Sequence, residues 1–413
     1  MTTVRNEPVA SVGQRPKDRK AQIARAAAEA FSELGYHAAG MEAIATRVGV
    51  SPAALYRHYS GKYDLFRDSV LALGQQLVDG TDFINTEPDD AEPAVTLQHL
   101  VHALIDVTLL NREAGGLYRW QARYLHDDDR SIVKSQLRLV HARIHQPLTI
   151  LRPGLTSSQR WMLSCALLSV IGSIVDHRVP LAPAEIRALL TDATSAILAT
   201  DLPHPDDTIA CPPAWRIFNP DAGTYEALLH ASMGLFYRHG YAETSMAQIA
   251  SAVGIPVSGI YRYFSGKNEI LSAGLVRAAD RVSGHYAVVT DDLSDPQQMW
   301  AMARAAFVAT SFANPELAAI HYTERVNLPR TDQDVLRGVH RSTIDSWARL
   351  LTSIRPELTA TQARFLMHAA MALVVDVGRL VDYDNSGRAP TGDSSYPQAC
   401  VRQLMQASLF GCE

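Results

Sequence analysis

The sequence predicts an all-α protein built from two tandem copies of one helical unit. A stretch from Phe31 to Lys62 recurs from Phe236 to Lys267 at a constant offset of 205 residues, and 13 of its 32 positions are identical. Unrelated stretches of this length would share about two, since a common residue makes up roughly 7% of proteins. Apolar residues recur with the helical period throughout, and no segment shows a convincing strand pattern. A proline-rich stretch, 200–222, separates the copies.

The duplication extends beyond that stretch. LRPGLTSSQRWMLSCALL from Leu151 matches IRPELTATQARFLMHAAM from Ile354 at an offset of 203. A further match, at an offset of 202, pairs YRWQARYL with IHYTERVN and keeps Arg123 opposite Arg325. The copied unit is therefore about 200 residues long, and a chain of 413 residues is too long for a single core. We call the copies unit one and unit two.

Each unit begins with a pattern that is typical of a helix-turn-helix. In unit one, apolar periodicity predicts helices over 17–34, 41–48 and 52–59, and a fourth helix from Lys62. Gly35 and Gly49 follow the first two helices, where a residue that tolerates positive φ ends a helix. Ser51 is a natural N-cap, and Pro52 suits the first helical position. A short basic and aromatic helix after such a turn is typical of helices that enter the major groove of DNA.

The net charge of −5 argues against nucleic-acid binding, but its distribution does not. Residues 1–62 hold nine Lys and Arg against five Asp and Glu, residues 219–267 hold three of each, and the rest carries −9. A basic end on an acidic body suits docking of one face on DNA. The four cysteines form no CxxC motif, and the N-terminus lacks the apolar core of a secretory signal. We expect a cytoplasmic protein that joins the nucleoid when bound to DNA.

These residues resemble the TetR family of bacterial transcriptional regulators. The resemblance rests on GVSPAALYRHYSGK in unit one and GIPVSGIYRYFSGK in unit two, in which a glycine turn precedes a helix that ends in Tyr-Arg. It covers about 50 residues of each unit strongly and the helical remainder weakly. Most members carry one unit and work as homodimers. A tandem chain is similar to rarer actinobacterial members, some of which control lipid- or sterol-related genes.

The resemblance implies a DNA-binding domain and a helical ligand-binding and dimerisation domain in each unit. The last two helices of a unit normally build a four-helix dimer interface, so helices near 155–176 and 358–380 are expected to pair within one chain as an intramolecular pseudo-dimer. The middle helices normally enclose an apolar ligand pocket, and filling it moves the DNA-binding domains apart. The expected domains are a flexible basic arm (1–16), a first helix-turn-helix domain (17–79) and regulatory domain (80–199), a linker (200–222), and a second helix-turn-helix domain (223–283) and regulatory domain (284–413).

The residues that we expect to contact DNA lie in the arm, around the second and third helices, and at the start of the fourth. They are Arg15, Lys17, Arg19, Lys20, Ser51, Ala53, Ala54, Tyr56, Arg57, His58 and Lys62 in unit one, and Thr244, Ser245, Ser258, Gly259, Tyr261, Arg262, Tyr263 and Lys267 in unit two. Guanidinium groups pair with phosphate or guanine edges, and a lysine at a helix start suits a phosphate. Because Ala53 aligns with Ser258, the two helices should read different half-sites.

Structural alternatives stand beside these assignments. Tyr56 and Tyr261 suit a DNA contact or half-burial against the first helix, and we favour contact because their neighbours are polar and basic. Tyr59 and Phe264 are expected in the core. Unit two lacks a basic arm, and each missing cation removes roughly one released counterion from the salt dependence of binding. Unit one should therefore contribute more affinity.

An aromatic group with an arginine in each unit is a candidate pocket lining for an apolar acid or an acyl thioester. Its members are Trp120, Arg123, Tyr124, Tyr322 and Arg325. The alternative, which we favour, is core aromatics with a structural ion pair. His141 and His145 have the i, i+4 spacing of zinc ligands but no nearby Glu or Cys pattern, so a surface face is the better interpretation. Asp127, Asp128 and Asp129 more plausibly begin a helix than bind a metal. We expect no cofactor.

The sequence therefore predicts a non-enzymatic repressor that binds double-stranded operator DNA and responds to a small apolar effector. No membrane partner is expected, since the longest apolar run, Trp161–Val175, is shorter than the ~18 residues that span a bilayer. Two alternatives stay open: unit two serves only as an assembly scaffold, or the chain is a small-molecule enzyme on a helical scaffold. The latter lacks any nucleophile–base arrangement or phosphate-binding loop. Further self-association on DNA is also open.

Overall fold

The computed structural model describes residues 16–86, 88, 91–204, 216–290, 295–381 and 395–411. Every regular element in these ranges is helical, which confirms the all-α prediction. In unit one the elements are α1 (Pro16–Leu34), α2 (Met41–Val48), α3 (Pro52–Tyr56), α4 (Lys62–Gly80), η1 (Asp82–Asn85), α5 (Pro93–Leu110), η2 (Leu117–Gln121), η3 (Ala122–Tyr124), α6 (Asp127–Leu151), α7 (Ser157–Gly172), η4 (Ser173–Val175) and α8 (Pro183–Ala199).

Unit two repeats this order almost element for element. It contains η5 (Pro220–Ala222), α9 (Thr224–His239), α10 (Met246–Val253), α11 (Val257–Ile260), α12 (Lys267–Thr290), α13 (Pro296–Ala313), α14 (Pro315–Glu324), η6 (Arg325–Asn327), α15 (Arg330–Ile354), α16 (Ala360–Val381) and α17 (Ser395–Phe410). The most visible difference lies between the first body helix and the long one after it, where η2 is a π-helical turn and its counterpart α14 is a regular helix.

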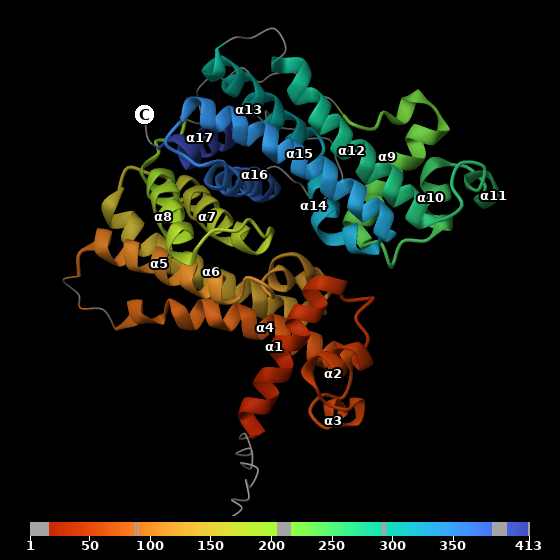
Figure 1. The fold of residues 1–413 in the computed structure, drawn as a ribbon, viewed down its shortest axis with the longest axis horizontal. Coiled ribbons are helices and arrows are strands. Elements are labelled where there is room, and N and C mark those ends of the chain that lie inside the picture. The colour runs from red at the N-terminus through yellow and green to blue at the C-terminus, as the bar shows by residue number, and fades with distance from the viewer. Residues whose placement is uncertain are drawn as a thin grey trace, which may run out of the picture.

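The helix-turn-helix of each unit forms as its sequence predicts. Gly49 and Gly254 adopt left-handed φ values of 70° and 75° at the ends of α2 and α10, a conformation that costs other residues energy. The third helix is shorter than the expected 52–59, because α3 ends at Tyr56 and a looser turn continues to Tyr59. The short helices α3 and α11 lie at the periphery of the molecule, far from α8 and α17 (Figure 1).

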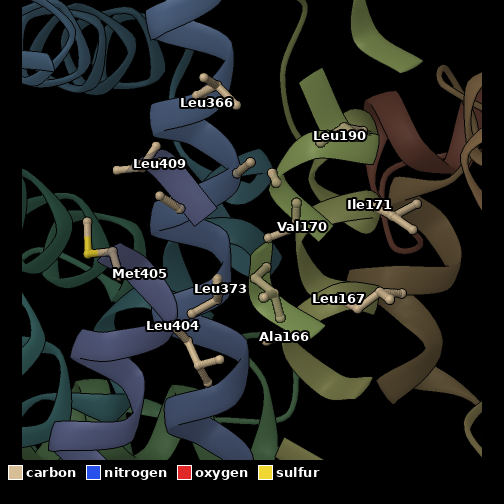
Figure 2. Close-up of a cluster of buried hydrophobic side chains, with 14 of the residues drawn as sticks. Ala166, Leu167, Val170, Ile171, Leu190, Leu366, Leu373, Leu404, Met405 and Leu409 are labelled. Carbon is tan, nitrogen blue, oxygen red and sulfur yellow. The ribbon is translucent and has the colours of Figure 1, made fainter. Parts of the chain in front are cut away.

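One large apolar core is shared by the two units. It contains buried residues from α5–α8 of unit one and from α13 and α15–α17 of unit two. Val170 of α7 faces Leu373 of α16, and Leu404 of α17 lies near them, whereas Leu167 points from α7 toward the other helices of unit one (Figure 2). The helices expected near 155–176 and 358–380 therefore pack against each other, as the family resemblance implies. The described stretches Pro93–Leu110 and Ser157–Val175 have the length and composition of membrane spans, but both contribute residues to this core.

Each helix-turn-helix has its own smaller core. In unit one, Phe31 and Phe66 meet edge to face at 5.4 Å within a cluster that also contains Leu117 of the body. In unit two, the last residues of the expected linker enter the corresponding cluster, since Ile217 and Phe218 are buried there. The connection between the units therefore ends inside the core of unit two.

Candidate DNA-binding surface and cavity

In unit one, α3 presents the expected basic and aromatic side chains. The Ser51 hydroxyl caps the helix by accepting the Ala54 N–H at 3.2 Å. Tyr59 is buried beneath the helix, as predicted, whereas Tyr56 is 55% exposed. Ala53, Arg57 and His58 are also exposed. The side chains expected to meet DNA thus share the solvent face of one capped turn.

In unit two, α11 presents the corresponding residues but begins differently. Pro256 stands at the N-cap position, and no side chain closes this helix end. Phe264 is buried as predicted, and Tyr261 is 55% exposed. Ser258, Arg262 and Tyr263 are exposed, and Gly259 is half-buried. A hydroxyl in place of a methyl group gives α11 a hydrogen-bonding capacity that α3 lacks at this position.

Lys62 and Lys267 hold the turn that follows the first helix of each domain. Lys62 Nζ donates to the His37 carbonyl at 2.9 Å and lies 4.8 Å from the Tyr36 ring centroid. Lys267 Nζ donates to the Tyr241 carbonyl at 2.6 Å and lies 4.5 Å from that ring. Burial lowers the pKa of both ammonium groups. Because an ammonium carries three N–H groups, these contacts leave donor capacity for a phosphate.

The structure corrects the assignment of Thr244. This side chain is buried, and its hydroxyl donates to the Gly240 carbonyl at 2.8 Å, so it cannot reach DNA in this conformation. Ser245 is exposed, but its hydroxyl forms a capping box with Gln248 at the start of α10. Residues directly before a helix commonly serve as caps.

The basic arm is only partly visible. Arg15 lies outside the described residues, as do the side chains of Lys17 and Arg19, whose backbone belongs to α1. Lys20 Nζ lies 3.1 Å from the Asp68 carboxylate on α4 and 5.2 Å from the Tyr59 ring centroid. Lys20 therefore ties α1 to α4, which competes with a phosphate contact.

Four of the five residues expected to line a pocket do not line either described cavity; only Tyr322 does. The four are Trp120, Arg123, Tyr124 and Arg325. The Trp120 ring stacks on the Tyr322 ring at 4.3 Å with an interplanar angle of 7°. Their segments are equivalent in the two units, so the stack joins unit one to unit two. The interpretation as packed aromatics fits this arrangement better than a pocket lining.

The hydrogen bonds and the ion pair of the Arg123 guanidinium all cross the boundary between the units. Its guanidinium donates to the carbonyls of Phe236 and Tyr237 at 3.3 and 2.9 Å and to the Thr323 hydroxyl at 3.2 Å. It also lies 3.4 Å from the Glu324 carboxylate, which is fully buried and receives the Tyr124 hydroxyl at 3.2 Å. Burial raises the pKa of Glu324.

The larger of the two described cavities lies inside unit one and has a volume of about 550 Å³. Apolar side chains of α4–α7 make most of its wall, including Leu73, Leu104 and Leu168. Two residues of unit two, Tyr237 and Asp376, complete it. The corresponding cavity in unit two measures about 150 Å³. Of these two described cavities, the one in unit one is therefore clearly the larger.

A buried ion cluster lies beside this cavity at the boundary between the units, and its members Arg119 and Asp376 form part of the cavity wall. Arg119 lies 3.0 Å from the Asp176 carboxylate of its own unit and 2.6 Å from the Asp376 carboxylate of unit two. The Ser169 hydroxyl also donates to Asp376, at 2.6 Å. Burial raises the pKa of Asp176 to about 6, against the opposing effect of Arg119. Arg119 and Asp376 carry no signal in the sequence, since neither breaks a periodic pattern nor forms a recognisable motif.

The expectation that His141 and His145 lie on a surface face is wrong, because both side chains are partly buried. Both rings contact the Ser164 hydroxyl of α7 at 2.9 Å, and His141 also lines the cavity. Burial lowers the pKa of His141 to about 4. Residues Asp127, Asp128 and Asp129 begin α6, as expected. No group of three or more potential metal ligands occurs in the described part of the chain.

Comparisons with known proteins identify the helix-turn-helix units. Residues 23–68 and 228–273 each match the model of bacterial regulatory proteins of the tetR family. A stretch of 65 residues, 16% of the chain, is 49% identical to the HTH-type transcriptional activator FasR of Mycolicibacterium smegmatis. This match spans only 28% of that relative's length.

Solved structures that are similar to this chain cover somewhat less than half of it. A TetR-family regulator from Bordetella parapertussis 12822 is 22% identical, with a TM-score of 0.38 over 45% of this chain and 94% of its own. The ketosteroid regulator KstR2 of Mycobacterium tuberculosis is 17% identical, with a TM-score of 0.38 over 47% and 97%. Each unit of this chain therefore carries the DNA-binding domain of the tetR family of bacterial regulatory proteins.

Proposed function

We propose that this regulator is a repressor that binds an asymmetric operator through both units and leaves it when a small apolar ligand occupies unit one. The observation that carries the proposal is the matched exposure of Tyr56–Arg57 and Tyr261–Arg262 on two unlike helices. Helices of this type read successive major grooves ~34–36 Å apart. The shared core of α7, α8, α16 and α17 serves as the intramolecular counterpart of a homodimer interface.

The cavity of unit one supports an apolar effector. Its volume of about 550 Å³ lies within the usual range of small-molecule pockets, and its lining combines apolar walls with a few polar groups. A lipid- or sterol-derived compound agrees with this chemistry. The smaller space in unit two supports one principal ligand site in each chain.

Footprinting on the upstream region of the protein's own gene, followed by binding to designed sites, tests the proposal. We expect the natural asymmetric site to bind better than palindromes of either half. Arg57→Ala and Arg262→Ala should each weaken binding by ~1–3 kcal/mol and relax specificity in different half-sites. Equal affinity for both palindromes would contradict the proposal.

The competing proposal, that only unit one reads DNA, is favoured by one feature. Residues 219–267 carry no net charge, whereas residues 1–62 carry +4. Replacing both Arg262 and Lys267 with alanine separates the two proposals. Unchanged operator affinity and salt dependence would assign unit two to a scaffold role.

The direction of regulation has its own test. FasR, which matches over 65 residues, is named an activator, whereas we propose repression because a chain seated across two major grooves obstructs the promoter. A reporter fused to the footprinted promoter should rise when this protein is deleted. A fall would assign activation.

A further inference from the structure

We infer that residues 117–124 couple the cavity of unit one to both DNA-binding domains, and that Arg123 carries the signal across to unit two. This inference rests on the proposed ligand response and specifies how it is transmitted. Side chains of this short segment contact the cavity, the DNA-binding domain of unit one and the DNA-binding domain of unit two.

One side of the segment forms the wall of the cavity. Tyr118, Arg119 and Ala122 all line it. The backbone of residues 117–121 forms a π-helical turn, η2, an irregularity that is frequently found at functional sites. A molecule that enters the cavity therefore contacts a segment whose backbone departs from regular α-helical geometry.

The segment also contacts the DNA-binding domain of unit one, through the side-chain amide of Gln121. Gln121 Nε2 donates to the Phe31 carbonyl at 3.1 Å, and Gln121 Oε1 accepts the Tyr36 N–H at 2.8 Å. The Phe31 carbonyl also accepts the Gly35 N–H, so this contact closes the C-terminal end of α1. The amide supplies both the donor and the acceptor that this helix end requires.

At the corresponding helix end of unit two, the hydrogen-bond acceptor comes from unit two and the donor comes from unit one. Glu324 accepts the Tyr241 N–H, but a carboxylate cannot donate to the Phe236 carbonyl. Arg123 of unit one supplies that donor at 3.3 Å and also reaches the Tyr237 carbonyl. The C-terminal end of α9 is therefore completed by the other unit, and the Tyr237 side chain lines the unit-one cavity.

These contacts make the coupling asymmetric. An occupant that displaces Tyr118, Arg119 or Ala122 also moves Gln121 and Arg123, because all five belong to one short stretch. Gln121 then shifts α1 of unit one, and Arg123 shifts α9 of unit two. One ligand site thus acts on both recognition helices, although they belong to different units.

Hydrogen exchange measured by mass spectrometry on the full chain tests the coupling, with the uncharged fluorophore N-phenyl-1-naphthylamine as the cavity probe. Val107→Trp, which fills the cavity, should block the probe and thereby show where it binds. In the wild type, we expect the probe to raise exchange several-fold in peptides covering 31–37 and 236–242. A change confined to 31–37 would overturn the inference.

A double variant cuts the link to unit two while preserving the helix end. Arg123→Met combined with Glu324→Gln removes the buried ion pair and gives unit two an amide that can serve both roles, as Gln121 does in unit one. The probe response in 236–242 should disappear, and the response in 31–37 should remain. A response in 236–242 that persists in this variant would also overturn the inference.

A further experiment without any ligand tests the coupling if the probe does not bind. A Cβ at Gly172 would overlap Arg119 Nη1, so Gly172→Ala should displace Arg119 and raise exchange at both helix ends. Gly338→Ala, which meets no atom within 4 Å, is the matched control. Identical exchange in the two variants at 236–242 would refute the coupling. Operator binding is measured separately, so loss of the coupling is distinguishable from loss of ligand-controlled DNA binding.

Discussion

At the scale of single residues, the two recognition helices differ most at their first position. Ser51 closes the start of α3 with its hydroxyl, whereas Pro256 leaves the start of α11 without a side-chain cap. The situation is reversed one helix earlier, where Ser245 caps α10 and Gly40 leaves α2 uncapped by a side chain. Each helix-turn-helix therefore has one side-chain cap, at a different place.

Ser51→Ala should lower the free energy of unfolding of the first DNA-binding domain by about 1 kcal/mol, because the Ala54 N–H loses its acceptor. Hydrogen exchange of residues 52–59 measures this change in the full chain. Ser258→Ala, which removes an exposed hydroxyl without a capping role, is the control. Equal protection in the two variants would show that the cap contributes nothing.

Residue identity predicted burial well where a side chain had one plausible place. Tyr59 and Phe264 were assigned to the core on their position in the third helix, and both are buried. The prediction of burial failed for His141 and His145, because the spacing of polar residues along a helix does not reveal that a serine of α7 lies within hydrogen-bonding distance of both rings. A hydrogen-bonding partner from another helix has no local signature.

At the scale of elements, the tight turns of the two helix-turn-helix units depend on glycine. Gly49 has a φ of 70°, and a Cβ there would meet no atom within 4 Å. The cost of substitution is therefore confined to the backbone. Gly338 lies inside α15 with equally open surroundings but with helical geometry.

These two glycines give a prediction of opposite sign. Gly49→Ala should destabilise its domain by about 1–2 kcal/mol, because a left-handed conformation is unfavourable for alanine. Gly338→Ala should stabilise the protein by about 0.5–1 kcal/mol through helix propensity. Urea unfolding followed by circular dichroism measures both. Changes of the same sign would contradict the assigned backbone geometry.

Element boundaries follow the sequence closely where caps and turns mark them. The predicted 41–48 helix is observed as Met41–Val48, and the fourth helix begins at Lys62. The π-helical turn at 117–121 could not be predicted, because the pattern YRWQARYL is compatible with a regular helix. Its geometry depends on contacts with α1, α4 and unit two.

At the scale of the whole molecule, the shared core makes folding of the two units interdependent. Leu373→Ala removes a fully buried side chain at the contact between α7 and α16 and should cost about 2–5 kcal/mol. Because the core belongs to both units, calorimetry should show one transition that moves to lower temperature. Two separate transitions, with only the second shifted, would show that the units fold independently.

Four histidines, of which His177 is buried and the other three are partly buried, form a chain from unit one into unit two and should make stability depend on pH. His177 stacks on His368 at 4.2 Å, and His340 lies between His368 and His321 at 5.4 and 5.5 Å. Burial lowers the pKa of His340 to about 4 and that of His368 to about 3, and the pKa values of the other two are also lowered. The nearby charges are also cationic, with Arg112 and Arg178 facing His177 and Arg325 facing His321 and His340.

In the unfolded state these histidines bind protons near pH 6.5, whereas in the folded state they stay neutral at that pH. Their contribution to the free energy of unfolding is therefore complete above pH 6.5 and is lost as the pH falls toward 4. For His340 this loss is on the order of 3 kcal/mol. The raised pKa of Asp176 acts in the opposite direction, so the wild-type slope is a net effect. Urea unfolding at pH values between 7.5 and 5 measures this dependence. In His340→Gln, the free energy of unfolding should fall less steeply with decreasing pH than in the wild type. An unchanged slope would contradict this account.

The sequence by itself determined the repeat, the all-helical class and the chemistry of the two recognition helices. These features depend on periodicity, caps and turns within about 30 consecutive residues, and such signals are local. Only the tertiary structure decided where the cavity lies, which unit holds the larger one, and that Arg119 and Arg123 join the units. Those outcomes depend on which side chains meet across elements some 100–250 residues apart in the sequence. For example, the hydrogen-bond donor that Glu324 cannot provide is supplied by a residue of the other unit.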